Sequence, residues 1–181
     1  MTKINLLGIS GSLRKASHNT KLLHEAIRRF GPADATIASL DLPLYNGDLE
    51  DEVGLPPAVA QLVEQIRASD ALILATPEYN KMIPGVLKNA LDWISRAKPQ
   101  PLVGKPLAII STAGRSGGEV AQFTLRHALA TFNANVLQGS AMVVPGLDAA
   151  FDSQGRLVSE AQQRSLDRLM ARLREAATPQ P

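Results

Sequence analysis

The sequence predicts a doubly wound α/β fold: a five-stranded parallel sheet in the order 2-1-3-4-5, with helices on both faces. Short apolar runs alternate along the chain with longer segments in which apolar residues recur at helical spacing. Three of these runs are apolar almost throughout, which is typical of strands that are covered on both faces in a parallel sheet. The three runs are 4–9, 71–75 and 107–110.

The first part of the chain supplies two strands and the helix between them. The run 4–10 leads through a polar loop into a helix over 20–30, where apolar residues form one stripe. The second run, 36–42, is followed by Pro43, which favours a turn. Asp41, near the end of that run, is expected to be a strand-end or turn residue.

The middle of the chain repeats this pattern twice. A helix over 58–68 is indicated by an apolar stripe and leads to the third strand, 71–76. Pro84 stands at the start of the next helix, 84–94, where its missing N–H group costs nothing. The Lys88 and Asp92 side chains, four residues apart on this helix, are expected to form a modest pair.

The last part of the chain completes the alternation. The fourth strand is expected at 107–112 and the fifth at 136–144, with helices at 119–132 and 160–175. A chain of 181 residues can bury a full core without disulfides or metals. We therefore expect one domain over residues 1–177, followed by a frayed tail at 178–181.

Composition and charge exclude several classes of protein. Hydrophobic residues make up 45% of the chain and charged residues 20%, which are ordinary globular proportions. The formal net charge of +2 is too small and too dispersed for a nucleic-acid surface. No run approaches the roughly 20 apolar residues of a membrane span. The chain has no cysteine, which favours a reducing compartment, so we expect a cytoplasmic protein with neither a nucleic-acid nor a membrane partner.

The loop after the first strand carries an unusual concentration of polar groups. In a sheet of this order, ligands bind beyond the carboxyl ends of the strands, between the first and third strands. Helix N-termini present unpaired N–H groups and a positive dipole end, which favour a phosphate, and an arginine can add a bidentate contact. A simple helix cap would explain Ser17 or Asn19 alone but not the whole set. The candidate phosphate-binding residues are Ser12, Arg14, Ser17, His18 and Asn19.

The type of phosphate follows from what the loop lacks. It has no Gly-x-Gly-x-x-Gly motif for a pyrophosphate and no Gly-x-x-x-x-Gly-Lys-Ser/Thr motif for a nucleotide triphosphate. A loop lined by hydroxyls and amides suits a terminal phosphate monoester, such as the one that FMN carries. The sequence therefore predicts FMN rather than a dinucleotide as the bound cofactor.

Two further loops follow the third and fourth strands. After the third strand, an aromatic ring and an amide braced by prolines can face the edge of a flat heteroaromatic ring. After the fourth strand, glycines permit a close backbone approach, although they can equally make a plain turn. The candidate ring-binding residues are Pro77, Glu78, Tyr79, Asn80, Lys81, Ala113 and Gly114.

These motifs resemble those of the NADPH-dependent FMN reductase family, and within it the bacterial quinone and chromate reductases. The resemblance covers nearly the whole chain, and the two long motifs at this spacing are specific. The residues that carry it are Gly11-Ser12-Leu13-Arg14 with Ser17 and Asn19, Pro77-Glu78-Tyr79-Asn80, and Pro84-Gly85 with 87–93.

The resemblance implies a flavodoxin-like fold, tightly bound FMN and NAD(P)H as the hydride donor. It places the FMN phosphate and ribityl chain on 12–19 and the isoalloxazine ring on 78–81, with a backbone contact from Ala113. It also implies a homodimer or homotetramer with the flavin near a subunit interface. Trp93 and Ile94 are expected to be either core or subunit-interface residues.

The resulting hypothesis is an enzyme that passes electrons from NAD(P)H through FMN to a small-molecule acceptor. The acceptor is a quinone, an azo compound, a nitro compound, free flavin or a metal oxyanion, and no motif distinguishes NADH from NADPH. The flavin carries the chemistry, so no catalytic side chain is assigned. The alternative is a flavodoxin-type electron carrier, but such carriers are usually strongly acidic and this chain is not.

Overall fold

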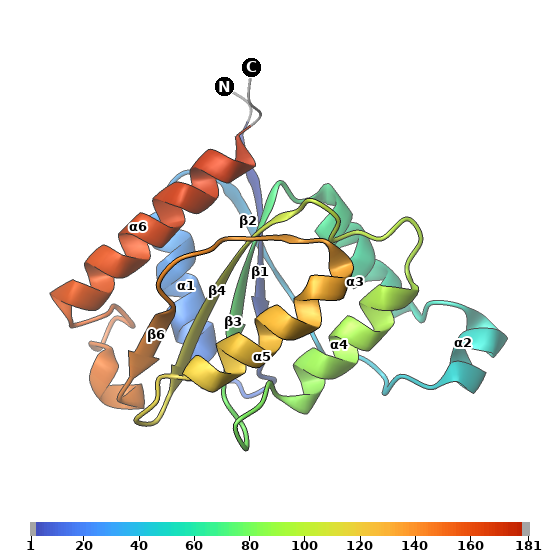
Figure 1. The fold of residues 1–181 in the computed structure, drawn as a ribbon, viewed down its shortest axis with the longest axis horizontal. Helices are drawn as coiled ribbons and strands as arrows, with labels where there is room; N and C mark the ends of the chain where they lie inside the picture. Colours follow the sequence, from blue (N-terminus) through green and yellow to red (C-terminus); the bar gives the residue numbers. More distant parts are fainter. Residues whose placement is uncertain (1–2, 179–181) are drawn as a thin grey trace.

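The computed structural model describes residues 3–178, which form one parallel sheet with helices on both faces (Figure 1). The sheet order is β2-β1-β3-β4-β5, and a further short strand, β6, also pairs with β4. The predicted fold class and strand order are therefore confirmed. The strands are β1 (Asn5–Ser10), β2 (Asp34–Ala38), β3 (Ala71–Thr76), β4 (Pro106–Ala113), β5 (Asn135–Val136) and β6 (Met142–Pro145).

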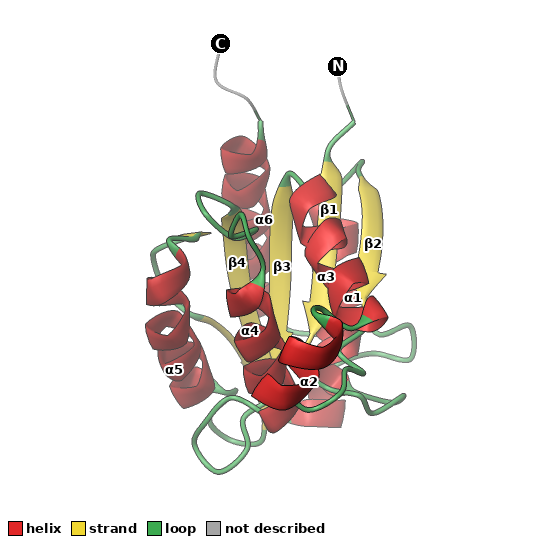
Figure 2. Ribbon diagram, turned by 90° about the vertical axis from the view of Figure 1, so that its right-hand side faces the viewer, coloured by secondary structure: helices red, strands yellow, loops and turns green. Residues whose placement is uncertain are grey.

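The helices form two layers, one on each face of the sheet (Figures 1 and 2). Helices α1 (His18–Phe30) and α6 (Glu160–Ala177) pack on one face, while α3 (Pro57–Ala68), α4 (Gly85–Arg96) and α5 (Glu119–Leu129) pack on the other. Strand residues alternate between the two cores, because successive side chains point to opposite faces. The central strand β3 is buried over its whole length, as its apolar run predicts.

The expected fifth strand is instead two short strands. β5 pairs with β4 at Pro106 and Leu107, and β6 pairs with it from Ile110 to Ala113. Three steps along β4, from Leu107 to Ile110, lie opposite six steps along the neighbouring segment, from Val136 to Met142. The extra residues cannot pair with β4. The prediction of one continuous strand over 136–144 is therefore wrong.

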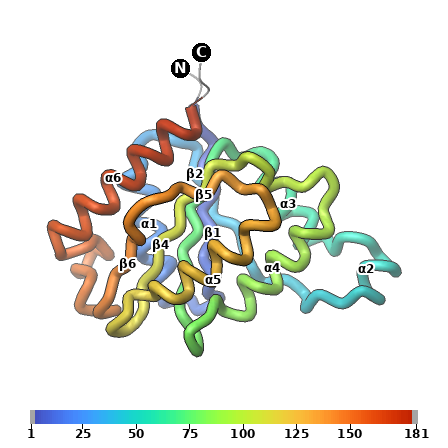
Figure 3. Tube along the Cα trace, viewed as in Figure 1, coloured from blue at the N-terminus to red at the C-terminus, as the bar shows by residue number. Residues whose placement is uncertain are grey.

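The segment between β2 and α3 also differs from the prediction. The sequence predicted this strand over 36–42, but β2 ends at Ala38. Leu40 and Leu42 pack on the core from the loop that follows it. A short helix, α2 (Gly47–Val53), follows and stands apart from the sheet (Figure 3). The Asn46 side chain caps it by accepting a hydrogen bond of 3.0 Å from the Asp48 N–H group. α2 buries no residue, so it lacks the apolar stripe on which the sequence prediction depended.

Trp93 and Ile94 are core residues rather than interface residues, since both are buried within this chain. The Trp93 indole N–H donates a hydrogen bond of 2.8 Å to the Pro43 carbonyl, and the Tyr45 ring packs edge-on against the indole. The predicted pair of Lys88 and Asp92 is present at 2.5 Å. Among residues 3–178, no helix is both long enough and apolar enough to cross a membrane.

Two 3₁₀ helices complete the fold. One, η1 (Ala130–Phe132), continues α5, and the other, η2 (Leu147–Ala150), follows β6. The predicted tail at 178–181 lies outside the described residues except for Thr178, which ends α6.

Candidate functional site

An open cleft of about 260 Å³ lies at the carboxyl ends of β1, β3 and β4. It is located where the order of the sheet reverses, because β1 pairs with β2 on one side and with β3 on the other. The lining residues come from the loops after these three strands and from η2. They are Ser12, Arg14, Ser17, His18, Asn19, Pro77, Glu78, Tyr79, Thr112, Ala113, Gly114 and Leu147.

The cleft brings together most of the site residues predicted from the sequence. Asn80 and Lys81 are the exceptions, since they lie outside the lining at the tip of the β3 loop. Thr112 and Leu147 line the cleft but were not predicted. Thr112 is the last residue but one of β4 and Leu147 follows β6, so both lie at the carboxyl end of a parallel strand. Applying the strand-end rule to the last strand as well would have found Leu147.

The start of α1 forms one end of the cleft. Ser17 is the N-cap residue, and its side-chain oxygen accepts a hydrogen bond of 3.3 Å from the Thr20 N–H group. Helix geometry leaves the N–H groups of His18 and Asn19 without a partner inside the helix. The Arg14 side chain forms no hydrogen bond or ion pair within residues 3–178, and its backbone N–H contacts Ser12 Oγ at 3.3 Å. These donors remain available to an anion.

The Asn19 amide connects α1 to the end of β4. Its Nδ2 donates to the Thr112 carbonyl at 2.9 Å, and its Oδ1 accepts from the Thr112 N–H group at 3.0 Å. Both polar ends of this buried amide are therefore occupied within the protein. Asn19 thus fixes the distance between two walls of the cleft, and it also lines the cleft, where the second N–H of its amide has no partner within residues 3–178.

Thr112 leaves one polar atom without a partner. The residue is buried and lines the cleft, yet its Oγ1 atom has no hydrogen-bond partner within residues 3–178. A buried hydroxyl without a partner is costly, and native proteins rarely keep one without a reason. A polar ligand in the cleft would supply the missing partner.

Close packing supports the base of the cleft at Gly11. Its N–H group donates to the Ala75 carbonyl at 2.8 Å, which joins the end of β1 to β3. A side-chain carbon at this position would lie 3.2 Å from Pro77 and 3.3 Å from Pro84. Only glycine lets these two prolines approach β1 without a shift.

His18 attaches η2 to the rim. Its Nε2 atom lies 2.6 Å from Asp148 Oδ1, and its ring is stacked on Phe151 with the centroids 6.5 Å apart. The hydrogen bond with His18 lowers the pKa of Asp148, and the nearby charges of Lys21 and Arg14 act in the same direction. These contacts hold Leu147 at the mouth of the cleft.

A tight hairpin turn follows β3. Two hydrogen bonds join Tyr79 and Met82, at 3.1 Å and 3.0 Å, and the two residues between them have positive φ angles of 52° and 64°. This is the geometry of a type I′ turn, in which asparagine is well tolerated. Asn80 and Lys81 therefore shape the loop, which leaves Tyr79 half exposed beside the cleft.

The Glu78 carboxylate ties this hairpin to the β4–α5 connection. It accepts hydrogen bonds from Ser116 Oγ and the Ala121 N–H group, both at 3.2 Å, and from Lys81 Nζ at 3.3 Å. Burial alone would raise the pKa of Glu78, but these three donors outweigh it and lower the pKa below its ordinary value. The carboxylate is thus a fixed negative charge in the wall of the cleft.

The β4–α5 connection turns sharply at Gly118, whose φ is +91°. A side-chain carbon there would lie 2.8 Å from Ser111 Cβ, so both the backbone angle and the available space require glycine. Ser111 Oγ in turn donates to the Gly117 carbonyl at 2.7 Å. The turn brings the start of α5 within reach of Glu78.

The chemistry of the cleft fits FMN. Free helix N–H groups and Arg14 at the α1 end suit a phosphate monoester. The orphaned Thr112 hydroxyl lies in the wall between that end and the Tyr79 side. Tyr79 and Leu147 offer apolar surface for a planar ring. Nothing in this lining conflicts with a flavin mononucleotide.

A doubly wound sheet with a cleft and free helix N–H groups at its switch point is typical of flavodoxin-like, mononucleotide-binding proteins. The sequence profile described as NADPH-dependent FMN reductase matches residues 4–148. The chain belongs to that family. The predicted resemblance is therefore confirmed.

Individual relatives agree with this assignment. The chain is 47% identical to an NAD(P)H-dependent FMN reductase of Pseudomonas aeruginosa, over 87% of this chain and 86% of the relative. It is 41% identical to a quinone reductase of Escherichia coli, over 75% and 74% of the two chains. The solved structure of a flavoenzyme NAD(P)H:(acceptor) oxidoreductase of Paracoccus denitrificans matches with a TM-score of 0.85 at 30% identity, covering 96% of this chain and 97% of that one.

These similarities confirm the predicted enzyme class. The chain is an FMN-dependent oxidoreductase that uses NAD(P)H, and nothing favours the flavodoxin-type carrier. Its acceptors are small molecules.

Proposed function

We propose that this enzyme passes electrons from NAD(P)H through FMN to a quinone. The meeting of the β1 and β3 loops at one open cleft carries this proposal, because a flavin held there stays accessible from solvent. The quinone reductase of Escherichia coli supports this choice of acceptor. In this proposal, residues 1–177 form one FMN-binding domain, and the enzyme acts in the cytoplasm.

The residues at the two ends of the cleft divide the work of holding the cofactor. Ser12, Arg14 and the N–H groups at the start of α1 would hold the phosphate. Tyr79 and the backbone at Ala113 and Gly114 would flank the ring. Bound FMN would accept the hydride from NAD(P)H and pass the electrons on. The protein would orient the ring and leave it accessible to substrates from the open side of the cleft.

Cofactor analysis and turnover test this proposal together. Protein purified from cells should be yellow, and denaturation should release FMN. The holoenzyme should oxidise NADH or NADPH in the presence of benzoquinone, with loss of the quinone absorbance. Release of FAD, or no nucleotide oxidation with any quinone, would contradict it.

We also propose that the enzyme is a homodimer, or a tetramer of such dimers, that uses the surface beside the cleft. Apolar side chains from the hairpin and from α5 are exposed there, and burying them would remove apolar area from water. They are Tyr79, Met82, Val120 and Phe123.

Light scattering at micromolar concentration should show an assembly of two or four chains. Phe123 is 73% exposed, so Phe123→Ser should shift the population toward monomer without unfolding the chain. A matched change far from this surface, Val53→Ser on α2, should leave the assembly intact. A wild-type monomer under these conditions would refute the assembly.

A further inference from the structure

Glu78 places a full negative charge inside the wall of the cleft. Its side chain is only 6% exposed, although the residue lines a site open to solvent. A charge shielded from water acts over a longer distance than one on the surface, because little solvent screens it. The ionisation state of Glu78 therefore matters to whatever is bound in the cleft.

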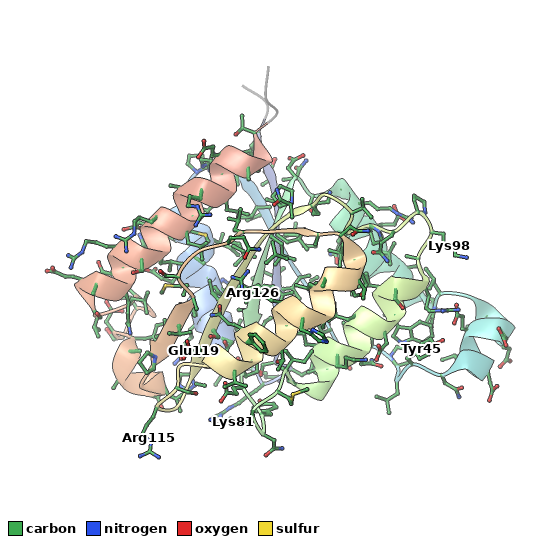
Figure 4. The ribbon with its side chains drawn as sticks, viewed as in Figure 1. Tyr45, Lys81, Lys98, Arg115, Glu119 and Arg126 are labelled. Carbon is green, nitrogen blue, oxygen red and sulfur yellow. The ribbon has the colours of Figure 1, made fainter. Side chains whose placement is uncertain are left out.

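The groups that surround Glu78 hold it ionised and fixed. Ser116 and the Ala121 N–H group bind the carboxylate from the β4–α5 side, and the Ala121 N–H belongs to the first turn of α5. The positive end of a helix dipole stabilises a carboxylate in this position. Lys81 is the cation that contacts it, and its side chain is 72% exposed (Figure 4).

We propose that Glu78 sets the reduction potential of the flavin: its fixed negative charge opposes reduction, and Lys81 partly offsets it. The proposal rests on the proposed binding of FMN in this cleft. Reduction by NAD(P)H adds two electrons and one proton to the flavin and leaves NAD(P)⁺. Onward transfer passes two electrons and that proton from the reduced flavin to the quinone, which takes its second proton from water and leaves as the quinol. A charge that opposes electron gain makes reduction of the flavin by NAD(P)H less favourable. It makes the transfer of electrons from the reduced flavin to the quinone more favourable.

A substitution that removes the charge of Glu78 but keeps its shape distinguishes an electrostatic role from a structural one. Glu78→Gln keeps an oxygen that can accept from the Ala121 N–H group but removes the charge. The flavin potential of this holoenzyme variant should therefore rise. We expect a change of about tenfold in the equilibrium between oxidised and reduced flavin, which is about 30 mV for a two-electron couple.

Lys81→Gln supplies a matched test of opposite sign. Loss of a positive charge should lower the potential, because reduction is then opposed more strongly. Lys81 is largely exposed, so this variant should fold even if Glu78→Gln does not. Glu119→Gln serves as the control, since this residue is exposed at the start of α5 and does not line the cleft (Figure 4). Its flavin potential should equal that of the wild type.

Spectroelectrochemical titration of the three holoenzymes and the wild type decides the matter. Shifts of opposite sign for the Glu78 and Lys81 variants support the proposal. Shifts of the same sign, or none, overturn it, because loosening of the hairpin would affect both variants alike. Failure of the wild type to bind FMN would instead refute the proposed function, so the two failures are distinguishable.

Discussion

The loop that leads from β1 into α1 and the hairpin that follows β3 face each other across the cleft but are built in opposite ways. The first keeps polar groups unused, notably the Arg14 guanidinium and the N–H groups at the start of α1. The second uses its polar groups internally, with Glu78 bound by three donors and Tyr79 joined to Met82 by two hydrogen bonds.

This difference separates binding from shaping. Donors left free at a preformed helix start can contact an anion without first breaking an internal bond. A loop whose hydrogen bonds are already satisfied cannot offer them to a ligand, but it holds its shape. The first region should therefore govern affinity for FMN, and the second should govern geometry and electrostatics.

The most sensitive test of the binding region is Arg14→Ala. A hydrogen bond to a charged group contributes about 1.5–3 kcal/mol, so FMN affinity should fall roughly ten- to a hundredfold. Riboflavin has the same ring and ribityl chain without the phosphate, and its affinity should barely change. The measurement is the ratio of the two dissociation constants in wild type and variant. If FMN and riboflavin lose affinity equally, Arg14 does not contact the phosphate.

Asn19→Ala should behave differently, although the residue lies in the same loop. Both ends of its amide bind the Thr112 backbone, and the change leaves buried groups without partners. We expect the free energy of unfolding to fall by about 1–3 kcal/mol, measured by urea denaturation of the apoprotein. Asn19→Asp loses the donor and sets a carboxylate oxygen against the Thr112 carbonyl in a buried position, so it should not recover this loss at neutral pH. Unchanged stability of the Asn19→Ala apoprotein would contradict the bridging role.

Thr112→Val sharpens the contrast between the two kinds of residue. The hydroxyl has no partner among residues 3–178, so its removal should not decrease the stability of the apoprotein. If FMN supplies the partner, its affinity should fall by about two- to tenfold, equivalent to about 0.5–1.5 kcal/mol. The combination of lower stability and unchanged FMN affinity would show that the hydroxyl serves the fold.

The smallest expected effect concerns the shaping region and acid. The folded pKa of Glu78 lies below its ordinary value of 4.5, so the carboxylate stabilises the fold above about pH 4.5. This contribution, about 1 kcal/mol or less, should be lost as the pH falls through the folded pKa. The apoprotein of Glu78→Gln should therefore show a shallower loss of stability than the wild type as the pH falls below about 4.5. Parallel curves from denaturant titrations would contradict this.

How much of this was predictable from the sequence depended on periodicity. β3 and the helix over 58–68 were found within one residue of their bounds, since both carry continuous or regularly spaced apolar residues. α2 was missed because none of its residues is fully buried, and β2 was placed late because Leu40 and Leu42 are buried from a loop. Local patterns do not record whether an apolar residue is buried by a strand or by a loop.

The candidate site was predictable in its position but not in the roles of its residues. Strand ends at a switch point indicated which loops meet, and most predicted residues line the cleft. The sequence could not show that the Asn19 amide is occupied by Thr112, or that Glu78 reaches the start of α5. Both contacts join segments far apart in the chain, and only the folded geometry brings them within reach.

The divided edge formed by β5 and β6 has a consequence for crowded solutions. A long exposed edge strand offers a continuous row of N–H and C=O groups to which a strand of another chain can pair, and such pairing seeds aggregation. Here the row beyond β4 is carried by strands of two and four residues, with 137–141 looping out between them. An incoming strand of ordinary length would find no continuous ladder on that side. The interruption between β5 and β6 thus disfavours edge-to-edge pairing on this side of the sheet at high concentration, while β2 forms the opposite edge.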